Sequence, residues 1–349
     1  MRSDPIRLFF EDFPVGASGE CGPRLVTREE ITAFAREFDP QPFHLDEETA
    51  KGSFVGELIA SGWHSCAMMM RLMYDGVIHK TSSMGAPGVE EVKWLRPVRP
   101  DDLLMACWNV LETRLSRSRP ELGLVHLRVL LVNQRGQHVY EQLFWAMFGR
   151  RGAGPPPERR PAPAQGDGDA AAKPGDAPAR PAGMPRPAAS QPMFFPDLVV
   201  GEAYEIGSYR FTEQNIIRFA KAYDPQPFHV DPEAAANSHF GALCASGWHT
   251  ASACMRKLID RREAQREALG AKGLRPPAMG PSPGFKELVW AKPVYVGDEI
   301  RYASALVAKR ESASRPGWGL IFSRNTGTNQ KGELVFSVVG SVFLETRPA

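Results

Sequence analysis

The sequence predicts an α+β protein made of two similar domains, each combining one buried helix with several antiparallel strands. Three observations support this class. A stretch rich in proline, alanine and glycine divides the 349 residues almost in half, and the two halves repeat one another. Within each half, segments with the apolar spacing of helices precede several strand-like runs. A chain of this length can supply two domains that each bury a core.

The dividing stretch covers residues 151–192, with 11 Pro, 11 Ala and 6 Gly among 42 positions. Such a composition buries too little apolar surface to offset the entropy that is lost when a chain becomes ordered. We therefore expect a disordered linker here, between one domain at residues 1–150 and a second at residues 193–349.

The repeat aligns long segments and is not a short periodic motif. An offset of 185 residues carries Thr27–His44 onto Thr212–His229, with 10 of 18 residues identical. Farther along the chain Trp94 aligns with Trp290, so the offset becomes 196. An insertion of 11 residues around 261–275 accounts for this change. The pattern is that of a duplicated domain.

The first helix of each unit is predicted from apolar spacing and a capping pattern. Thr27 and Glu30 fit a capping box, and prolines at positions 40 and 42 then end the helix and favour an extended loop. Four apolar residues repeat at helical spacing between these signals: Ile31, Phe34, Ala35 and Phe38.

A second helix is expected to begin near Gly62, with its counterpart over Gly247–Ile259. It is apolar on nearly every side, so it is predicted to be buried. Strand-like runs follow, and a curved antiparallel sheet wrapped around such a helix is the hot-dog arrangement. The predicted strands are Val89–Val98, Leu103–Leu115, Leu124–Asn133 and Val139–Phe148, with partners at Leu288–Val294, Glu299–Lys309, Leu320–Asn329 and Leu334–Leu344.

Composition excludes several classes of function. A formal net charge of +2 without any block of Lys or Arg argues against nucleic-acid binding. No run approaches the ~18 apolar residues of a membrane span, and the N-terminus has no signal-peptide pattern. The five cysteines show no C-x-x-C pair, which argues against disulfide and zinc frameworks and favours the reducing cytoplasm.

The most informative string is Asp39-Pro-Gln-Pro-Phe-His44, which recurs unchanged as Asp224 to His229. A carboxylate and an imidazole lie five residues apart in a loop that two prolines stiffen, as an acid–base pair requires. An ordinary turn after a helix is the competing interpretation. Two unchanged copies in halves that otherwise differ favour catalysis by Asp39, His44, Asp224 and His229.

A second string, Ala60-Ser-Gly-Trp63, recurs as Ala245 to Trp248. Gly62 and Gly247 stand at the start of the buried helix, where a backbone N–H and the helix dipole favour developing negative charge. Close packing of each glycine against the sheet is the alternative explanation. His64 and His249 follow and are interpreted as structural.

These motifs resemble the MaoC-like dehydratases and (R)-specific enoyl-CoA hydratases, whose pattern is Asp-x-Asn-Pro-x-His followed by an apolar-Ala/Val-His-Gly segment. The resemblance covers both halves and implies two MaoC-like hot-dog domains. Asp39, Pro42 and His44 are in register, as are their counterparts in the second half. The chain departs from the pattern at four positions: Gln41 and Gln226 replace Asn, and Ser61 and Ser246 replace His.

The resemblance implies a hydro-lyase that adds water to a 2-enoyl thioester or removes it from the hydroxyacyl product. The dyads would hold the water, and the N–H groups of Gly62 and Gly247 would bind the thioester oxygen. Two alternatives stay open, namely a hot-dog acyl-CoA thioesterase and an acyl-CoA-binding protein with one inactive half. The expected partner is an acyl-CoA or acyl-carrier-protein thioester, and acyl length and branching stay open.

No cofactor is expected, because no glycine-rich phosphate loop follows a strand. No metal is expected either, because no third ligand joins His44 and Asp46 at useful spacing. The two units are expected to pair as an internal pseudo-dimer, and further association into a homo-oligomer stays open. Arg262 and its neighbours in the insertion are expected on a solvated helix face, with a role at the second acyl entrance as the alternative.

Overall fold

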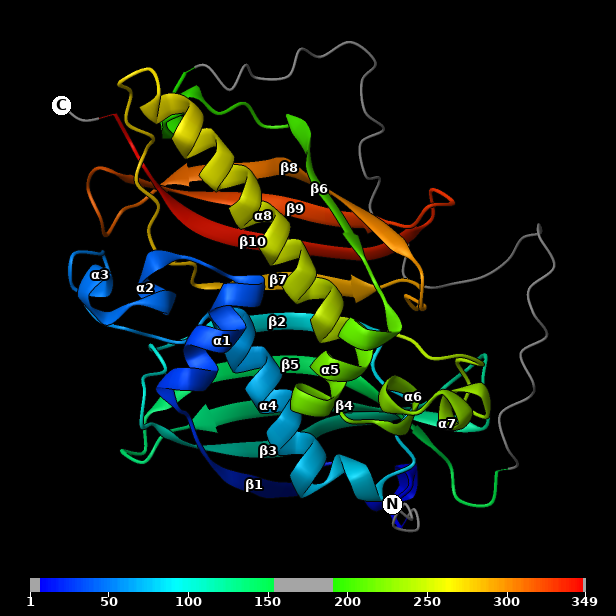
Figure 1. Cartoon of the computed structure of the whole chain (residues 1–349). Helices are drawn as coiled ribbons and strands as arrows, with labels where there is room; N and C mark the ends of the chain where they lie inside the picture. The colour runs from blue at the N-terminus through cyan, green and yellow to red at the C-terminus, as the bar shows by residue number, and fades with distance from the viewer. Residues whose placement is uncertain (1–6, 154–190, 348–349) are drawn as a thin grey trace.

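One antiparallel sheet of ten strands runs through both halves of the computed structural model, which describes residues 7–153 and 191–347 (Figure 1). The strand order is β1-β3-β4-β5-β2-β7-β10-β9-β8-β6. The first half supplies β1 (Ser18–Leu25), β2 (Gly88–Trp94), β3 (Leu103–Leu115), β4 (Leu122–Val132) and β5 (His138–Gly149). The second half supplies β6 (Ala203–Arg210), β7 (Gly284–Trp290), β8 (Glu299–Glu311), β9 (Trp318–Thr328) and β10 (Leu334–Glu345).

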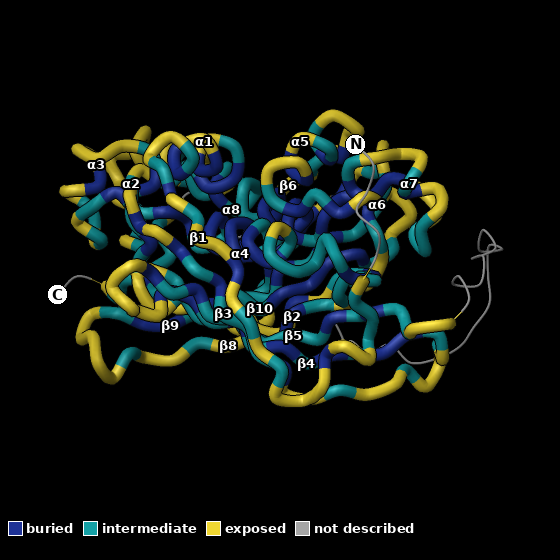
Figure 2. Tube along the Cα trace, turned by 90° about the horizontal axis from the view of Figure 1, so that it is seen from below, coloured by how far each residue is buried: buried dark blue, intermediate teal, exposed yellow. Residues whose placement is uncertain are grey.

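The helices form a layer over one face of this sheet, and the buried segments run between the two layers (Figure 2). In the first half they are α1 (Arg28–Phe38), α2 (Pro42–Leu45), α3 (Glu47–Lys51) and α4 (Gly62–Gly76). In the second half they are α5 (Glu213–Tyr223), α6 (Pro227–Val230), α7 (Pro232–Ala236) and α8 (Gly247–Gly270). Short 3-10 turns lie at Phe10–Asp12, Ile78–Lys80 and Phe195–Asp197.

The central helices α4 and α8 are buried against the sheet, as the sequence predicts. Met68 and Met69 of α4 expose at most 1% of their surface, and Ala251 and Ala253 of α8 are fully buried. Both halves contribute to one continuous hydrophobic core. The predicted α+β class, with two hot-dog units paired as an internal pseudo-dimer, is confirmed.

Strands β2 and β7 join the two halves as antiparallel neighbours, with Gly88 opposite Val289 and Lys93 opposite Gly284. Two glycines make this close approach possible. A Cβ atom on Gly88 would lie 2.1 Å from the Leu288 carbonyl oxygen, and one on Gly284 would lie 2.0 Å from the Val92 oxygen. Side chains at these positions would separate the ladder that makes two sheets into one.

The first helix begins at its predicted cap, since the Thr27 hydroxyl accepts a 3.1 Å hydrogen bond from the Glu30 N–H. The reciprocal half of the predicted capping box is not formed. The Glu30 carboxylate instead forms an ion pair with Arg24 and lies 3.4 Å from His64 Nε2. The Glu30 carboxylate therefore faces Arg24 and the buried His64 instead of the Thr27 backbone N–H.

Several features differ from the sequence-based predictions, including β7, which spans Gly284–Trp290 and not Leu288–Val294. The loop after α1 is not wholly extended, because Pro42 occupies the first position of the short helix α2, where a missing N–H costs nothing. The first strand of each half, β1 and β6, was not predicted. Strand β2 ends at Trp94 and not at Val98, and α8 continues to Gly270. The insertion in the second half therefore begins as three further turns of helix.

The predicted linker lies outside the described residues except for 151–153 and 191–192, so the boundaries at 150 and 193 remain our proposal. All five cysteines are free thiols. Within residues 7–153 and 191–347, no helix is long and apolar enough to cross a membrane.

Candidate active site

Asp224 and His229 lie together at the end of α5, where the predicted acid–base pair was expected. Asp224 is the C-cap of α5, and α6 starts at Pro227 and carries His229 in its single turn. The Asp224 Oδ2 and His229 Nε2 atoms are 3.5 Å apart. Asp224 exposes only 4% of its surface and His229 only 6%. The stiffened loop therefore brings the carboxylate and the imidazole face to face.

Neighbouring groups fix the protonation pattern of this pair. His229 Nδ1 lies 2.8 Å from the Cys244 carbonyl oxygen, which can only accept, so Nδ1 carries a proton. Burial lowers the pKa of His229, while the Asp224 carboxylate and the Cys244 carbonyl oppose this effect. A neutral imidazole then presents the lone pair of Nε2 to the carboxylate. Two acceptors that face each other at this distance can share one water molecule as donor.

Asp224 is held by two side chains that the sequence argument did not assign to the site. The Ser246 hydroxyl donates a 2.6 Å hydrogen bond to Oδ2, and Gln226 Nε2 donates a 3.0 Å bond to Oδ1. The same Ser246 hydroxyl also accepts from the Trp248 N–H at 3.3 Å, which caps α8. One serine therefore ties the carboxylate to the start of the central helix.

The first half repeats this arrangement closely. Asp39 Oδ2 and His44 Nε2 are 3.5 Å apart, and His44 Nδ1 lies 2.8 Å from the Ile59 carbonyl oxygen. Ser61 and Gln41 donate to Asp39 at 2.6 and 2.9 Å. The structure thus brings the predicted residues together in both halves. The Ser and Gln that depart from the family pattern are the carboxylate's own partners.

The two predicted oxyanion glycines also have a packing role. A Cβ atom on Gly62 would lie 2.4 Å from the Trp94 ring, and one on Gly247 would lie 2.2 Å from the Trp290 ring. Close packing alone therefore accounts for glycine at both positions. Their N–H groups make no hydrogen bond to another described backbone or side-chain atom. Each remains a donor at the first position of its helix.

His64 and His249 lie inside the helical layer, as their structural interpretation predicts. His64 stacks on Phe34 with ring centroids 4.7 Å apart, and His249 stacks on Phe219 at the same separation. Burial lowers the pKa of His64 and lowers that of His249 to about 3. Both rings are fully buried, so neither is placed to exchange protons with a bound molecule.

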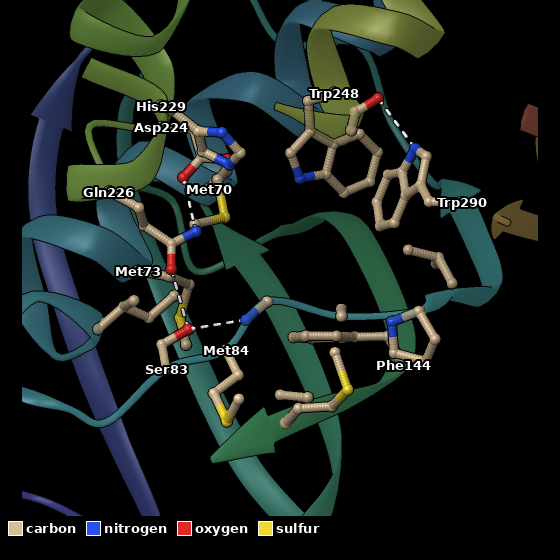
Figure 3. Close-up of a pocket in the computed structure, with 18 of the residues that line it drawn as sticks. Met70, Met73, Ser83, Met84, Phe144, Asp224, Gln226, His229, Trp248 and Trp290 are labelled. Carbon is tan, nitrogen blue, oxygen red and sulfur yellow. Dashed lines mark hydrogen bonds and ion pairs between the residues drawn. The ribbon is translucent and has the colours of Figure 1, made fainter. Parts of the chain in front are cut away.

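A cavity of about 280 Å³ reaches the second dyad, and Asp224, His229 and Gly247 all line it (Figure 3). Its far wall comes from the first half and is mostly apolar. The residues of that wall include Met69, Met70, Met73, Val77, Phe144 and Ala146. Ser83 of the first half donates a 2.9 Å hydrogen bond to Gln226 Oε1 and so links this wall to the dyad. Asp39 and His44 do not line this cavity.

The cavity thus brings the Asp224 carboxylate, the His229 imidazole and Gly247 to one mostly apolar space. Within residues 7–153 and 191–347, no group of three or more His, Cys, Asp or Glu side chains could hold a metal ion.

Comparison with known proteins matches both halves to one family. Residues 16–128 and 198–316 fit the family model described as MaoC like domain. An uncharacterized protein from Bacillus subtilis, YdeM, is 32% identical over 132 residues, which are 38% of this chain and 92% of that protein. The mesaconyl-CoA hydratase of Cereibacter sphaeroides is 36% identical over 64 residues, which are 18% of each chain.

Solved structures agree on the fold of the whole chain. A MaoC domain protein from Chloroflexus aurantiacus superimposes with a TM-score of 0.74 at 17% identity, covering 97% of this chain and 98% of that one. A Mycobacterium tuberculosis protein with a double hotdog fold gives 0.68 at 15% identity, covering 96% and 98%. At these identities the likeness concerns the fold.

Proposed function

The chain belongs to the family of MaoC-like domains, and from this membership and the site geometry we propose that it is a hydro-lyase acting on acyl thioesters. It would add water to a 2-enoyl-CoA or remove it from the 3-hydroxyacyl-CoA, or act on the same acyl groups on an acyl-carrier protein. The observation that carries this proposal is the pair of acceptors, Asp224 Oδ2 and His229 Nε2, 3.5 Å apart at a cavity.

In the hydration direction, a water molecule donates its two hydrogens to the carboxylate and to the imidazole. Its oxygen forms a bond to Cβ while one O–H bond breaks toward the dyad. The dyad then passes that proton to Cα on the same face, and its protonation state returns to the starting one. Acid–base catalysis of this kind typically contributes about 10²–10⁴-fold.

Negative charge develops on the thioester oxygen between these two proton transfers. The Gly247 N–H, at the first position of α8 and lining the cavity, would bind this oxygen, and Gly62 would do so in the first half. Loss of one such donor typically costs about 2.7–4 kcal/mol in the transition state. The residues proposed for catalysis are therefore Asp39, His44, Asp224 and His229, with Gly62 and Gly247 as oxyanion donors.

A role in acyl metabolism in the cytoplasm completes the proposal. Five free thiols without disulfides are in keeping with a reducing compartment. The internal pseudo-dimer would supply both sites within one chain.

The test is a panel of enoyl thioesters, including crotonyl-CoA and branched analogues, with loss of enoyl absorbance and chiral analysis of the product. We expect hydration with one stereochemical outcome. Release of free CoA thiol without a hydroxyacyl product would instead identify a thioesterase, and no turnover on the panel would contradict the proposal.

Matched variants separate chemistry from folding. The double variant Asp39→Asn/Asp224→Asn is expected to lose about 10²–10⁴-fold in kcat, while each single variant keeps part of the activity on the panel. Asp46→Asn/Asp231→Asn is the control, because these residues cap α3 and α7 from exposed positions and Asn also caps helices. Equal losses in both double variants would exclude the dyads.

A further inference from the structure

Each dyad faces the central helix of the other half. Arg71 of α4 donates to the Lys221 carbonyl oxygen of α5 at 2.8 Å, and Arg256 of α8 donates to the Arg36 carbonyl oxygen of α1 at 2.7 Å. The wall opposite Asp224 is therefore built by the first half, as the cavity shows. By the same symmetry, the wall opposite Asp39 is built by the second half.

The two walls differ first at Arg262. The offset of 185 residues that relates α4 to α8 aligns Arg262 with Val77, which lines the cavity of the second dyad. Arg262 is partly buried, and no described residue forms a hydrogen bond or ion pair with its guanidinium. Burial lowers the pKa of Arg262, while Tyr204 and Asp39 act in the opposite direction. Because Val77 lines the cavity of the second dyad, the symmetry of the two halves places Arg262 on the side of the first dyad.

The walls differ again on the inner face of the sheet. In the first half Trp108, Val129 and Gln142 stand opposite one another on β3, β4 and β5. In the second half this row is Ser304, Asn325 and Val338, on β8, β9 and β10. Ser304 and Asn325 thus take the places of Trp108 and Val129, whereas the apolar Val338 takes the place of the polar Gln142.

Asn325 has an unsatisfied buried acceptor. It exposes 7% of its surface, and its Oδ1 atom has no hydrogen-bond partner among the described residues. Gln142, the polar residue of the first-half row, differs because its Oε1 atom accepts from the Tyr140 hydroxyl. A buried polar atom without a partner is unfavourable, so its presence calls for a ligand or an ordered water.

The neighbouring pair of residues on β4 and β5 also differs from its counterpart on β9 and β10. Leu127 and Phe144 line the cavity and stand opposite each other, and their counterparts in the second half are Ser323 and Gly340. Replacement of Phe144 by glycine removes a whole ring from the wall. At this pair the second half therefore offers more space, with the hydroxyl of Ser323 where the first half has Leu127.

We propose that the two sites take different acyl groups: the second dyad takes an apolar chain, and the first takes a thioester whose acyl group carries a second carboxylate, bound by Arg262 and Asn325. The assignment rests on the proposed function. A guanidinium binds a carboxylate with charge-assisted hydrogen bonds, and the Asn325 amide can donate another. An apolar chain in that place would leave both groups desolvated and unpaired.

Binding is tested by calorimetry with two saturated probes of equal length, hexanoyl-CoA and hexanedioyl-CoA. Arg262→Leu is expected to weaken hexanedioyl-CoA about ten- to hundredfold and to leave hexanoyl-CoA unchanged, with Arg262→Lys between. Arg266→Leu, on the exposed part of α8, is the control and is expected to change neither affinity. Asn325→Val, which installs the residue found at Val129, is a second variant and is expected to weaken only the diacid.

Hydration assays with single-site variants test which acyl group each site takes. Asp39→Asn is expected to abolish hydration of hex-2-enedioyl-CoA and to keep at least half of the hydration of hex-2-enoyl-CoA, and Asp224→Asn is expected to do the reverse. Equal loss of both probes in Arg262→Leu would mean that Arg262 only balances the charge of Asp39, and would overturn the inference. So would diacid affinity unchanged in both Arg262→Leu and Asn325→Val, or diacid turnover that survives Asp39→Asn.

The two proposals fail in different ways. If the wild-type protein hydrates no enoyl thioester, the proposed function fails, while the calorimetric preference for the diacid still decides whether Arg262 and Asn325 bind a carboxylate. If hydration is found but no diacid is bound or turned over, only the assignment of acyl groups fails.

Discussion

The Ser83 hydroxyl donates a 2.9 Å hydrogen bond to Gln226 Oε1 across the boundary between the two halves. This bond fixes the orientation of the Gln226 amide, so that Nε2 points to Asp224 Oδ1. In the second half, Met279 holds the position of Ser83, because Met279 pairs with Leu344 as Ser83 pairs with Phe148, and its side chain has no hydrogen-bond donor. The first dyad therefore lacks this support.

Ser83→Ala is expected to lower kcat at the second site about three- to tenfold, since residues that orient a catalytic group typically matter at this level or above. Steady-state kinetics in an Asp39→Asn background isolates the second site. In an Asp224→Asn background the same substitution is expected to have no effect. A loss in both backgrounds would point to general destabilisation instead.

Ser246→Ala is expected to lower both stability and turnover, because one hydroxyl caps α8 and donates to Asp224. Loss of a helix cap costs about 0.5–2 kcal/mol, and a buried carboxylate that loses a donor adds to this. Thermal unfolding and kcat would be measured together. Ser246→Thr keeps the hydroxyl and is expected to retain most of both, whereas equal damage by Thr would argue for a steric cause.

The buried His249 predicts an acid-sensitive fold. Its pKa is about 3 in the folded protein against 6.5 for an unperturbed imidazole, so below pH 6.5 the unfolded state binds the proton preferentially. The free energy of unfolding is expected to be independent of this group above pH 6.5 and to fall steadily from there toward pH 3. Urea unfolding at pH 7.5 and pH 5 measures the effect. His249→Phe, which keeps an aromatic ring on Phe219, is expected to flatten this pH dependence; an unchanged slope would contradict it.

The cavity predicts which residue limits the length of the acyl chain at the second site. Ala146 lines the cavity, and its counterpart in the second half is Val342. Ala146→Leu is expected to lower kcat/KM for longer enoyl chains about tenfold and to spare crotonyl-CoA, since misfit by one or two methylenes costs about 1–3 kcal/mol. A series of enoyl-CoA lengths measures this. A uniform loss at all lengths would place Ala146 outside the acyl path.

Much of the fold follows from the sequence because the duplication doubles each local signal. Thr27 caps α1, the apolar run after Gly62 is buried, and the unchanged Asp and His of each half lie 3.5 Å apart. Strand β1 was missed because glycine and proline interrupt it and its apolar residues do not alternate clearly. Tertiary pairing, which local propensity does not contain, makes it a strand.

The sequence predicted that the Asp and His of each half lie together, but not which side chains hold them. In the sequence, Ser61 and Ser246 are only departures from the family pattern, whereas in the structure each hydroxyl donates to the carboxylate of its own half. Only the identical Ala-Ser-Gly-Trp strings hinted at such a role. Arg262 was expected on a solvated face or at the second entrance. It is partly buried instead, on a helix that packs against α1 of the other half, and no spacing along the sequence reveals that contact.

Each half builds the cavity wall that faces the dyad of the other half, and this has a consequence for how the protein can evolve. Selection on the reacting groups acts on one set of residues, and selection on acyl preference acts on another set in the opposite half. A duplicated gene can therefore hold two identical reactive strings constant while its two linings drift apart. Substrate range can then widen without any intermediate that has lost its chemistry.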